Sequence, residues 1–560
     1  MMFKNINLHE KNLKSFSNKP LNILGIHKDP WHNTGACIIR DNGKERQIAF
    51  LSEERKDRIK DSRNFPNLSI KACMDQLGIN NYDELDMVVM DYIEKDSWEL
   101  DQFKRKCRKD VFLKDFPKSK IFMVNHHLLH ACSVYFSSGF NDSAILIIDG
   151  RGSLKETQSL FIGEENDIKL LDKTDKIGIG LLYAAVTHDI GWQILQEGKT
   201  MGLAPYGRNI KNSIYKFPNK FKNITTDYSE FCEEGSYRIK QNHKVPVSFD
   251  EKARAAFEVQ EECEKALLHL AKYAKTTGKN KLCISGGVGL NSVSNNKIRT
   301  HEPKLFDEIF INPAASDTGI PFGAALYGYH ILANKPIVPY PLSPFLGPEY
   351  SEEEIKISID KFMQEIENNF IYIKKNSFQI ASTLLKKNFI VANFQGRSEM
   401  GPRALGNRSI LMSPTGVNNK DRLNLRVKHR ESFRPFAPAV LEERASEFFE
   451  IDVESPYMLF ICDVKKDKRK LLPAITHVDG TARLQTLNRD RNGKFYELVK
   501  IFGEETGVPV LLNTSFNVNG EPIVETPTDA IKCFVKTDID ALLIGDNILV
   551  KSGIDKNIYK

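Results

Sequence analysis

Five prolines crowd a short stretch past the middle of the chain and divide it into two parts. They lie within residues 333–350 and are Pro336, Pro339, Pro341, Pro344 and Pro348. Proline lacks a backbone N–H and has a fixed φ, so this stretch cannot continue a helix or a central strand. The sequence therefore predicts a linker, with an N-terminal domain over residues 1–340 and a C-terminal domain over residues 350–560.

Strand-like and helix-like patterns alternate in both parts. Apolar runs at Leu21–Asp29 and Ser143–Gly152 each open a set of strands that leads into helices. Apolar residues at three- and four-residue spacing in Glu251–Lys275 are typical of one long helix. Beyond the linker, Ala541–Val550 reads as a strand. The patterns predict an α/β protein with two related lobes in the N-terminal part and another α/β domain after the linker.

The composition excludes several classes of protein. The 560 residues carry 79 Lys and Arg against 73 Asp and Glu, a net charge of +6, which disfavours a nucleic-acid partner. Nine cysteines without a C-x-x-C pair argue against a disulfide framework or a zinc ribbon. The sequence has no apolar run of about 18 residues and a polar start, so we expect neither a membrane span nor a secretory signal. We predict a cytoplasmic enzyme and leave a homodimer open.

The stretch NHHLLHACS places His126 and His130 one helical turn apart, so both imidazoles share a face. His127 stands where a zinc protease has its glutamate base, so that class fits poorly. Two carboxylates, Asp149 and Asp317, follow strand-like or loop segments and can reach the same place. Two histidines with one or two carboxylates favour Fe(II) or a related divalent ion over structural zinc. Solvated helix histidines are the alternative.

Two glycine-rich junctions, DGRGS and SGGVGLN, are candidates for phosphate contacts. At such junctions backbone N–H groups can approach a phosphate closely, and neither stretch is a Walker loop. A tight turn is the alternative for each. The candidate nucleotide-binding residues here are Gly150, Gly152, Gly286, Gly287 and Asn291.

Basic residues are dense in GRSEMGPRALGNRSI and NLRVKHRESFRPFAP, where Gly and Pro place them on loops. Arginine forms charge-assisted, often bidentate hydrogen bonds with phosphates, so a pocket for a polyanionic small molecule is favoured. A nucleic-acid surface is the alternative. Further residues of the pocket come from DGTARLQT and from the end of VPVLLNTSF. The candidates are Arg403, Lys428, Arg434, Arg483, Ser515 and Asn517.

Together these stretches resemble one family, the NodU/CmcH carbamoyltransferases, from about residue 21 to residue 548. The resemblance rests on ten motifs in family order: SEERKDRIK, HHLLHA, IIDGRGS, GKTMGLAPYG, SGGVGLN, SDTGIPFGAAL, GPRALGNRSI, VKHRESFRPFAP, THVDGTARLQT and NTSFNVNGEPIV. The sequence departs from the family at Asn33, where Asp is usual, and at Asp61, where His is common.

The resemblance implies an actin/sugar-kinase-like (ribonuclease-H-like, two-lobed) N-terminal domain and a YrdC-like α/β C-terminal domain. It implies an ATP-dependent O-carbamoyltransferase in which carbamoyl phosphate and ATP form carbamoyl adenylate in the C-terminal domain. The N-terminal domain would then transfer the carbamoyl group to a hydroxyl of a sugar, antibiotic or toxin-like acceptor. Mg²⁺ is expected to accompany ATP.

The resemblance also assigns roles to residues. The family's iron ligands fall on His126, His130, Asp149 and Asp317. Its carbamoyl phosphate and nucleotide contacts fall on Arg403, Lys428, Arg434, Arg483, Ser515 and Asn517. Lys428 and Arg434 would act on the phosphates during catalysis, and either His32 or His127 would take the hydroxyl proton.

Two other functions stay open at this point. A tRNA threonylcarbamoyl-transferase-like enzyme would favour a more basic surface and would use one such domain rather than both. A nucleotide-regulated binding protein without turnover is the third possibility, because actin-like folds also serve as switches.

Overall fold

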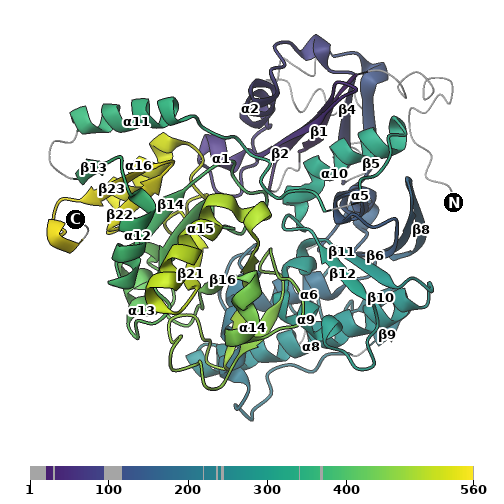
Figure 1. Ribbon diagram of the computed structural model, residues 1–560. Helices are drawn as coiled ribbons and strands as arrows, with labels where there is room; N and C mark the ends of the chain where they lie inside the picture. Colours follow the sequence, from purple (N-terminus) through teal and green to yellow (C-terminus); the bar gives the residue numbers. More distant parts are fainter. Residues whose placement is uncertain are drawn as a thin grey trace. The chain divides into compact units, whose positions relative to one another are not determined.

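The computed structural model describes residues 20–28, 32–93, 116–218, 220–234, 237–240, 245–339, 341–365 and 370–558. The chain divides into two compact units (Figure 1). One comprises Met1–Asp57 and Asp61–Pro344, and the other comprises Arg58–Lys60 and Phe345–Lys560. The division at Pro344 falls inside the proline-rich segment, while residues 1–19 lie outside the described part.

The first unit contains two five-stranded sheets, and the first sheet has the order β3-β2-β1-β4-β5. Its strands are β1 (Leu21–His27), β2 (Gly35–Asp41), β3 (Arg46–Ser52), β4 (Met87–Tyr92) and β5 (Ile121–Asn125). Strands β1, β2 and β3 form an antiparallel meander, and β4 and β5 join it in parallel.

The second sheet repeats this arrangement, with the order β12-β11-β6-β7-β8. Its strands are β6 (Asp142–Ile148), β7 (Gln158–Glu164), β8 (Asp167–Thr174), β11 (Lys281–Ser285) and β12 (Glu308–Ile311). Again three antiparallel strands come first and two parallel strands follow. The prediction of two related α/β lobes is confirmed, and this duplicated ribonuclease-H-like order is the one expected for an actin/sugar-kinase-like domain. A two-stranded hairpin of β9 (Lys220–Lys222) and β10 (Thr225–Asp227) stands apart.

Helices connect and cover these strands. They are α1 (Glu54–Asp57), α2 (Asn67–Leu77), α5 (His126–Ser138), α6 (Ile179–Asp189), α7 (Glu197–Leu203), α8 (Phe249–Lys275), α9 (Ser292–Arg299) and α10 (Ile320–Leu326). Helix α8 begins two residues before the predicted start because Ser248 caps it and forms a capping box with Glu251. Its predicted apolar face, including Val259 and Leu267, is fully buried.

The second unit is built on an eight-stranded mixed sheet, in the order β13-β23-β22-β14-β15-β21-β16-β20. These strands are β13 (Phe370–Ile373), β14 (Val391–Phe394), β15 (Arg408–Met412), β16 (Ala437–Leu441), β20 (Gln485–Leu487), β21 (Val510–Ser515), β22 (Ala541–Ile544) and β23 (Asn547–Lys551). A three-stranded sheet adds β17 (Phe449–Glu450), β18 (Ile461–Val464) and β19 (Thr481–Arg483).

Helices pack on both faces of the eight-stranded sheet, so it reads as an α/β layer structure. Successive strand residues point to opposite faces, so Val391 packs with α12 (Ser377–Lys386) and α15 (Arg489–Thr506), while its neighbour Ala392 packs with α11 (Glu352–Glu365) and α16 (Pro527–Lys536). The shorter helices are α13 (Asn419–Leu423) and α14 (Ala445–Phe448). The predicted α/β class is therefore confirmed in both units.

The segment Ala541–Val550, predicted as one strand, is a hairpin of β22 and β23. The two strands pair up to Ile544 and Asn547, leaving Gly545 and Asp546 as a two-residue turn. Gly545 has φ 56°, in the left-handed region that such turns require and that glycine reaches without strain. The single-strand prediction was wrong because Gly-Asp inside an apolar run was not interpreted as a turn.

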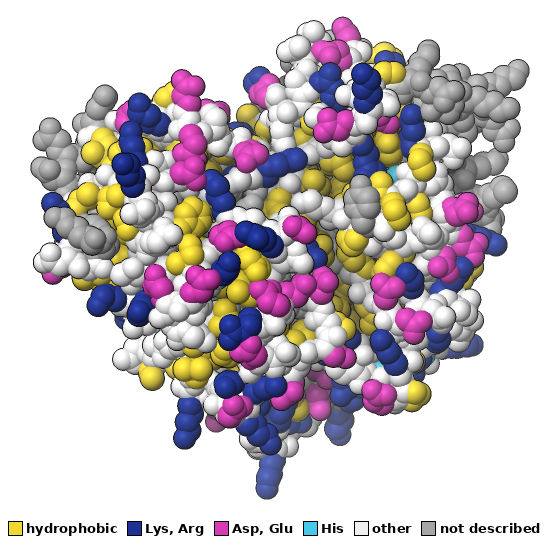
Figure 2. Space-filling model, viewed as in Figure 1, with side chains coloured by type: hydrophobic (Ala, Val, Ile, Leu, Met, Phe, Trp, Pro, Cys, Tyr) yellow, Lys and Arg dark blue, Asp and Glu magenta, His cyan; other side chains and the backbone are white. Residues whose placement is uncertain are grey.

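No helix in the described part of the chain combines the length and the apolar character that a membrane crossing requires. On the face shown in Figure 2, lysine and arginine side chains are interspersed with aspartate and glutamate side chains.

Candidate functional site

His126 and His130 lie in the first turns of α5, whose start is fixed by Asn125. The Asn125 side chain accepts a hydrogen bond from the backbone N–H of Leu128 at 2.9 Å, which caps the helix. Its amide group donates to the buried carboxylate of Glu156 at 2.8 Å. The two histidines are therefore presented from a helix end that is tied to the neighbouring loop.

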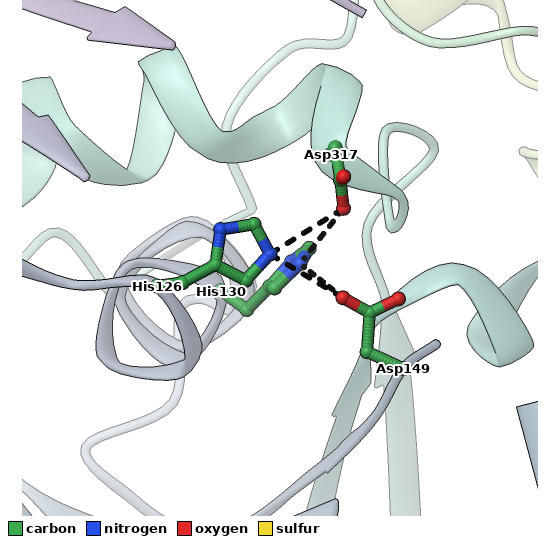
Figure 3. A group of neighbouring side chains, drawn as sticks. All are labelled: His126, His130, Asp149 and Asp317. Atoms are coloured by element: carbon green, nitrogen blue, oxygen red, sulfur yellow. Dashed lines mark hydrogen bonds and ion pairs between the residues drawn. The ribbon is translucent and has the colours of Figure 1, made fainter. Parts of the chain in front are cut away.

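Four side chains converge in front of this helix end (Figure 3). Nε2 of His126 lies 3.3 Å from Oδ2 of Asp149 and 3.5 Å from Oδ1 of Asp317. Nε2 of His130 lies 3.4 Å from each of the same two oxygens. All four residues are buried. The structure thus brings together the complete set that the sequence proposed for a metal.

Asp149 directly follows β6, and glycines hold its backbone in place. Gly286 has φ +91°, and a Cβ on it would lie 2.2 Å from the carbonyl oxygen of Ile148. A Cβ on Gly180 would lie 2.7 Å from the carbonyl oxygen of Asp149 itself. The backbone N–H of Gly287 donates to Oδ1 of Asp149 at 3.0 Å, which leaves Oδ2 directed at the histidines.

Asp317 begins the short 3₁₀ turn η8 (Asp317–Gly319), which leads directly into α10. Helix α10 packs very closely on α5, because a Cβ on Gly323 would lie 2.0 Å from the carbonyl oxygen of Leu129. Only a glycine permits that approach. The close packing of α10 on α5 brings Asp317 up to the two histidines.

The charges of the cluster stabilise one another. Burial alone would lower the pKa of His126, but the charge of Asp317 and hydrogen bonds to Asp149, Asp317 and Asp91 raise this pKa well above its usual value. Burial would raise the pKa of Asp149, but hydrogen bonds from His126 and His130 lower it well below its usual value. The pKa of Asp317 is lowered in the same way against burial and the charge of Asp149. The carboxylates therefore stay ionised, and a cation that enters displaces a proton from the imidazole of His126.

The donor set fits a divalent cation. One ligand atom from each of His126, His130, Asp149 and Asp317 lies within 4.8 Å of all the others. Nε2 of His130 is buried and faces Oδ2 of Asp149 and Oδ1 of Asp317, each at 3.4 Å, so it is placed to share a cation with these two oxygens. Two imidazole nitrogens and two carboxylate oxygens suit Fe(II) and similar ions better than a closed structural zinc site.

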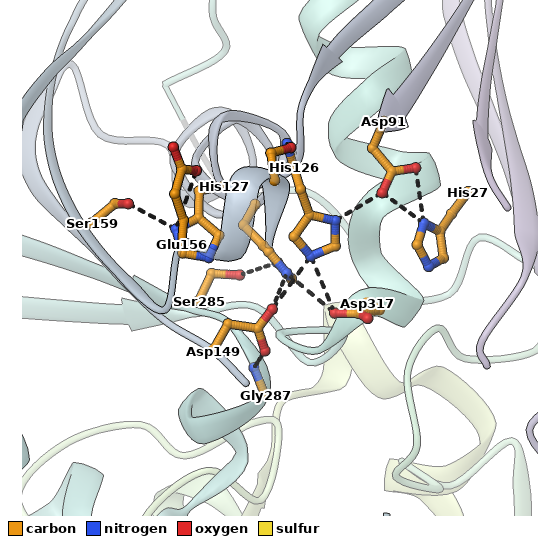
Figure 4. A network of polar contacts seen from close by, with 12 residues as sticks. His27, Asp91, His126, His127, Asp149, Glu156, Ser159, Ser285, Gly287 and Asp317 are labelled. Atoms are coloured by element: carbon orange, nitrogen blue, oxygen red, sulfur yellow. Dashed lines mark hydrogen bonds and ion pairs between the residues drawn. The ribbon is translucent and has the colours of Figure 1, made fainter. Parts of the chain in front are cut away.

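The two histidines predicted as proton acceptors have different surroundings. Nδ1 of His32 lies 3.8 Å from Oδ2 of Asp317, and its side chain is 24% exposed. His127 is fully buried and its Nδ1 lies 2.7 Å from Oγ of Ser159 (Figure 4). Burial lowers the pKa of His127 to about 3, so this imidazole is neutral. His32 is the one that combines access with proximity to the cluster.

Of the five residues predicted at the glycine-rich junctions, two support the position of Asp149 in this structure. Gly286 and Gly287 position Asp149, as described above. A Cβ on Gly152 would lie 2.5 Å from Cδ2 of His127, whereas one on Gly150 would meet open space. Asn291 caps α9 by accepting from the N–H of Ser294 at 3.0 Å and also donates to Gln260 at 3.0 Å.

The two departures from the family pattern share a backbone feature. Asn33 has φ 60° and Asp61 has φ 52°, both in the left-handed region. Asn and Asp adopt this conformation more readily than other residues with a side chain. Their local chain path is therefore compatible with these residue types.

In the second unit, Lys428 gathers two of the other predicted residues around itself. It ends the π-helical turn η10 (Asn424–Lys428), and its side chain is buried. Its amine donates to the backbone oxygens of Ser515 and Asn517, each at 2.8 Å. It also contacts Oδ1 of Asn517 at 2.7 Å and Oγ of Ser515 at 3.2 Å. Lys428 therefore links η10 to the end of β21.

Four arginines influence one another's charge and that of Lys428, and the five residues together are named the cationic pocket, after the role that the sequence predicts for them. The arginines are Arg403, Arg430, Arg434 and Arg483. Burial and the charge of Arg434 lower the pKa of Arg403 to about 10 and that of Arg430 to about 9. Burial and the charges of Arg403, Arg430 and Arg434 lower the pKa of Arg483 well below its usual value. The pKa of Lys428 is lowered likewise by burial, Arg430 and Arg434.

The cationic pocket contains buried N–H donors without a hydrogen-bond partner among the described residues. Nε of Arg403 and Nε of Arg483 are buried and make no hydrogen bond to any described residue. Glu431 lies 3.7 Å from Arg434 and partly offsets its charge. Buried N–H donors surrounded by like charge indicate a site for an anion, since such groups are costly when left unpaired.

Four residues of these sites were not among the sequence-based candidates, although Arg430 belongs to the arginine-rich segment that the sequence indicated. Arg430 joins the cationic pocket, stacked 4.3 Å above the ring of Phe436. Asp91, His27 and Ser285 contact the histidine cluster from behind. The available signal was weak: Asp91 is a carboxylate near the end of an apolar strand, and Arg430 stands in an arginine-rich loop.

Two family models match this chain. A carbamoyltransferase N-terminus model covers residues 98–326, and a carbamoyltransferase C-terminus model covers residues 382–551. The chain belongs to the carbamoyltransferase family. It is an enzyme that transfers carbamoyl groups.

The chain is also similar to curated proteins over most of its length. Nodulation protein NolNO of Sinorhizobium fredii is 34% identical over 95% of this chain and 80% of that protein. Nodulation protein NolO of Bradyrhizobium diazoefficiens is 36% identical over 76% of this chain and 79% of that protein. Among solved structures, HypF of T. kodakarensis has 14% identity and a TM-score of 0.32, covering 56% of this chain and 48% of that one.

Proposed function

We propose that this carbamoyltransferase is ATP-dependent and divides its reaction between its two units. The second unit would form carbamoyl adenylate from carbamoyl phosphate and ATP. The first would transfer the carbamoyl group to a hydroxyl of a small molecule, such as a sugar, an antibiotic or a toxin-like metabolite. The observation that carries the proposal is the cationic pocket, whose buried guanidinium donors have too little negative charge around them.

The cationic pocket suits two substrates that repel each other. Carbamoyl phosphate and ATP are both polyanions, and Arg403, Arg483 and Lys428 would reduce their mutual repulsion. Water would cleave carbamoyl phosphate into carbamate and orthophosphate, and a carbamate oxygen would then attack the α-phosphorus of ATP, forming carbamoyl adenylate and releasing pyrophosphate. Preorganised cations stabilise the charge that develops in such a step. Mg²⁺ would accompany the ATP phosphates.

In the first unit, the acceptor hydroxyl would attack the carbamoyl carbon, and AMP would leave. A divalent ion, Fe(II) by its donor set, would be held by His126, His130, Asp149 and Asp317. When bound, it would supply Lewis-acid stabilisation of negative charge. His32 would take the hydroxyl proton, because it is partly exposed and lies beside Asp317. His127 fits that role less well, since burial lowers its pKa to about 3.

The test follows pyrophosphate. Purified enzyme with Mg-ATP is expected to release pyrophosphate only when carbamoyl phosphate is added, with inorganic phosphate as the matched control anion. AMP release should additionally require an acceptor, and mass spectrometry of treated small-molecule extracts should show a gain of one carbamoyl group. Pyrophosphate release indifferent to carbamoyl phosphate, or ATP binding without any product, would count against the proposal.

A further inference from the structure

A second layer of buried polar groups lies behind the four candidate metal ligands (Figure 4). Nδ1 of His126 lies 2.8 Å from Oδ2 of Asp91, on the side of the ring opposite Asp149 and Asp317. Nδ1 of His27 approaches both oxygens of Asp91, at 2.9 and 3.0 Å. Strands β1 and β4 pair in parallel, with Ile26 opposite Met90, so His27 and Asp91 come side by side at the same level of the sheet.

The contact with Asp91 decides where His126 carries its proton. An ionised carboxylate only accepts hydrogen bonds, so Nδ1 of His126 is the donor. The other ring nitrogen, Nε2, is then the one left to offer a lone pair to a cation. Both His27 and His126 donate to Asp91, and this arrangement fixes the carboxylate in one orientation.

His130 is held differently. Oγ of Ser285 lies 3.3 Å from Nδ1 of His130 and also donates to the backbone oxygen of Ala315 at 3.1 Å. A hydroxyl has one proton to give, so Ser285 accepts from His130. Both histidines therefore direct Nε2 at the aspartates, but His126 is supported by a charged acceptor and His130 by a neutral one.

We propose that Asp91 is a positioning residue of the metal site, which keeps the proton of His126 on Nδ1, aims its Nε2 at the cluster and makes it the stronger donor of the two histidines. This inference rests on the metal site put forward under Proposed function. Mutation of a carboxylate that accepts a hydrogen bond from a ligating histidine typically lowers metal affinity by 10- to 100-fold. A neutral hydroxyl in the same place should matter less, because charge-assisted hydrogen bonds are roughly twice as strong as neutral ones.

The test is a Co²⁺ titration of metal-free protein, read by visible absorption and by competition with a chelator. We expect Asp91→Asn to bind Co²⁺ about 10- to 100-fold more weakly and to shift the absorption band. Ser285→Ala should lower the Co²⁺ affinity less than Asp91→Asn does. The matched control is Asp41→Asn, a buried carboxylate of the same sheet that accepts from Tyr329 at 2.9 Å, and its affinity should equal that of the unmodified protein.

The outcomes separate the two proposals. If the unmodified protein binds no Co²⁺, the metal site itself is overturned. If the unmodified protein binds Co²⁺ and Asp91→Asn binds it equally well with the same spectrum, the role of Asp91 is overturned. The same holds if Asp41→Asn loses as much Co²⁺ affinity as Asp91→Asn.

A measurement without substitution covers the case in which Asp91→Asn does not fold. In Zn²⁺-loaded, ¹⁵N-histidine-labelled protein, the Nδ1 proton of His126 should resonate further downfield than that of His130, because its acceptor is a carboxylate. The reverse order would overturn the proposal.

Discussion

The two polar centres of the molecule handle buried charge in opposite ways. In the first unit, imidazoles and carboxylates alternate around one point and stabilise each other's ionised forms, so the pKa of His126 rises and those of Asp149 and Asp317 fall. In the cationic pocket of the second unit, like charges face one another, and the pKa values of Lys428 and Arg483 are lowered. The first centre combines both signs of charge, whereas the residues of the second centre are cationic and their buried charges repel one another.

The difference also appears in how the side chains are supported. Those of the histidine cluster come from a helix start and from segments that directly follow or adjoin regular elements. Those of the cationic pocket come largely from loops between β14, β15 and β16, with Arg483 at the end of β19. A cluster of opposite charges can be rigid before a ligand binds, whereas buried like charges favour the binding of a polyanion.

The largest effect should separate the two centres completely. We expect Asp317→Ala to abolish Co²⁺ binding and to slow carbamoyl transfer by roughly 10³-fold, since Lewis-acid stabilisation is worth several kcal/mol. Carbamoyl-phosphate-dependent pyrophosphate release should persist, because Asp317 belongs to the other unit. Both half-reactions are measured on the same sample, with Asp41→Asn as control. Equal loss of both would refute the division of labour.

A smaller effect should reveal the strain in the cationic pocket. We expect Arg483→Met to lower carbamoyl-phosphate-dependent pyrophosphate release by about 10²- to 10³-fold. The free energy of unfolding without substrate should rise, because removing one buried like charge relieves repulsion. The matched control is Arg491→Met, since Arg491 is paired with Glu454 at 2.9 Å and should show neither change. A destabilised but active Arg483→Met protein would contradict this interpretation.

The smallest effect concerns two neighbouring glycines. Gly152→Ala places a methyl against the ring of His127, so we expect a loss of about 1–3 kcal/mol in unfolding free energy and a modest loss of Co²⁺ affinity. Gly150→Ala, where the methyl meets open space, should be close to neutral. Urea unfolding and Co²⁺ titration of both variants decide the matter. Equal behaviour of the two would show that the contact with His127 is unimportant.

Much of the fold was predictable because the spacing of apolar residues and the positions of prolines are local features of the sequence. Strand-like runs from Leu21 and Ser143, the helix ending at Lys275 and the proline-rich division all correspond to features of the structure. The hairpin at Gly545 was not predicted, because one glycine in an apolar run does not by itself indicate a turn.

The candidate sites show the same limit. The spacing of His126 and His130 places them on one helix face, and the positions of Asp149 and Asp317 after strand-like or loop segments bring them to the same place. Asp91 escaped notice because its contact depends on the parallel pairing of β1 with β4 and on the start of α5. Those are tertiary facts that no local pattern contains. Arg430 escaped because an arginine-rich loop does not reveal which of its guanidinium groups turn inward.

The glycines that press on Ile148 and Asp149 have a consequence for how this protein can diverge. Gly286 and Gly180 each leave no room for a methyl against that stretch of main chain. The location of the Asp149 carboxylate is thus set by contacts between backbones, which do not depend on the identity of nearby apolar side chains. Homologues can exchange those side chains freely while this carboxylate stays where it is, provided both glycines remain.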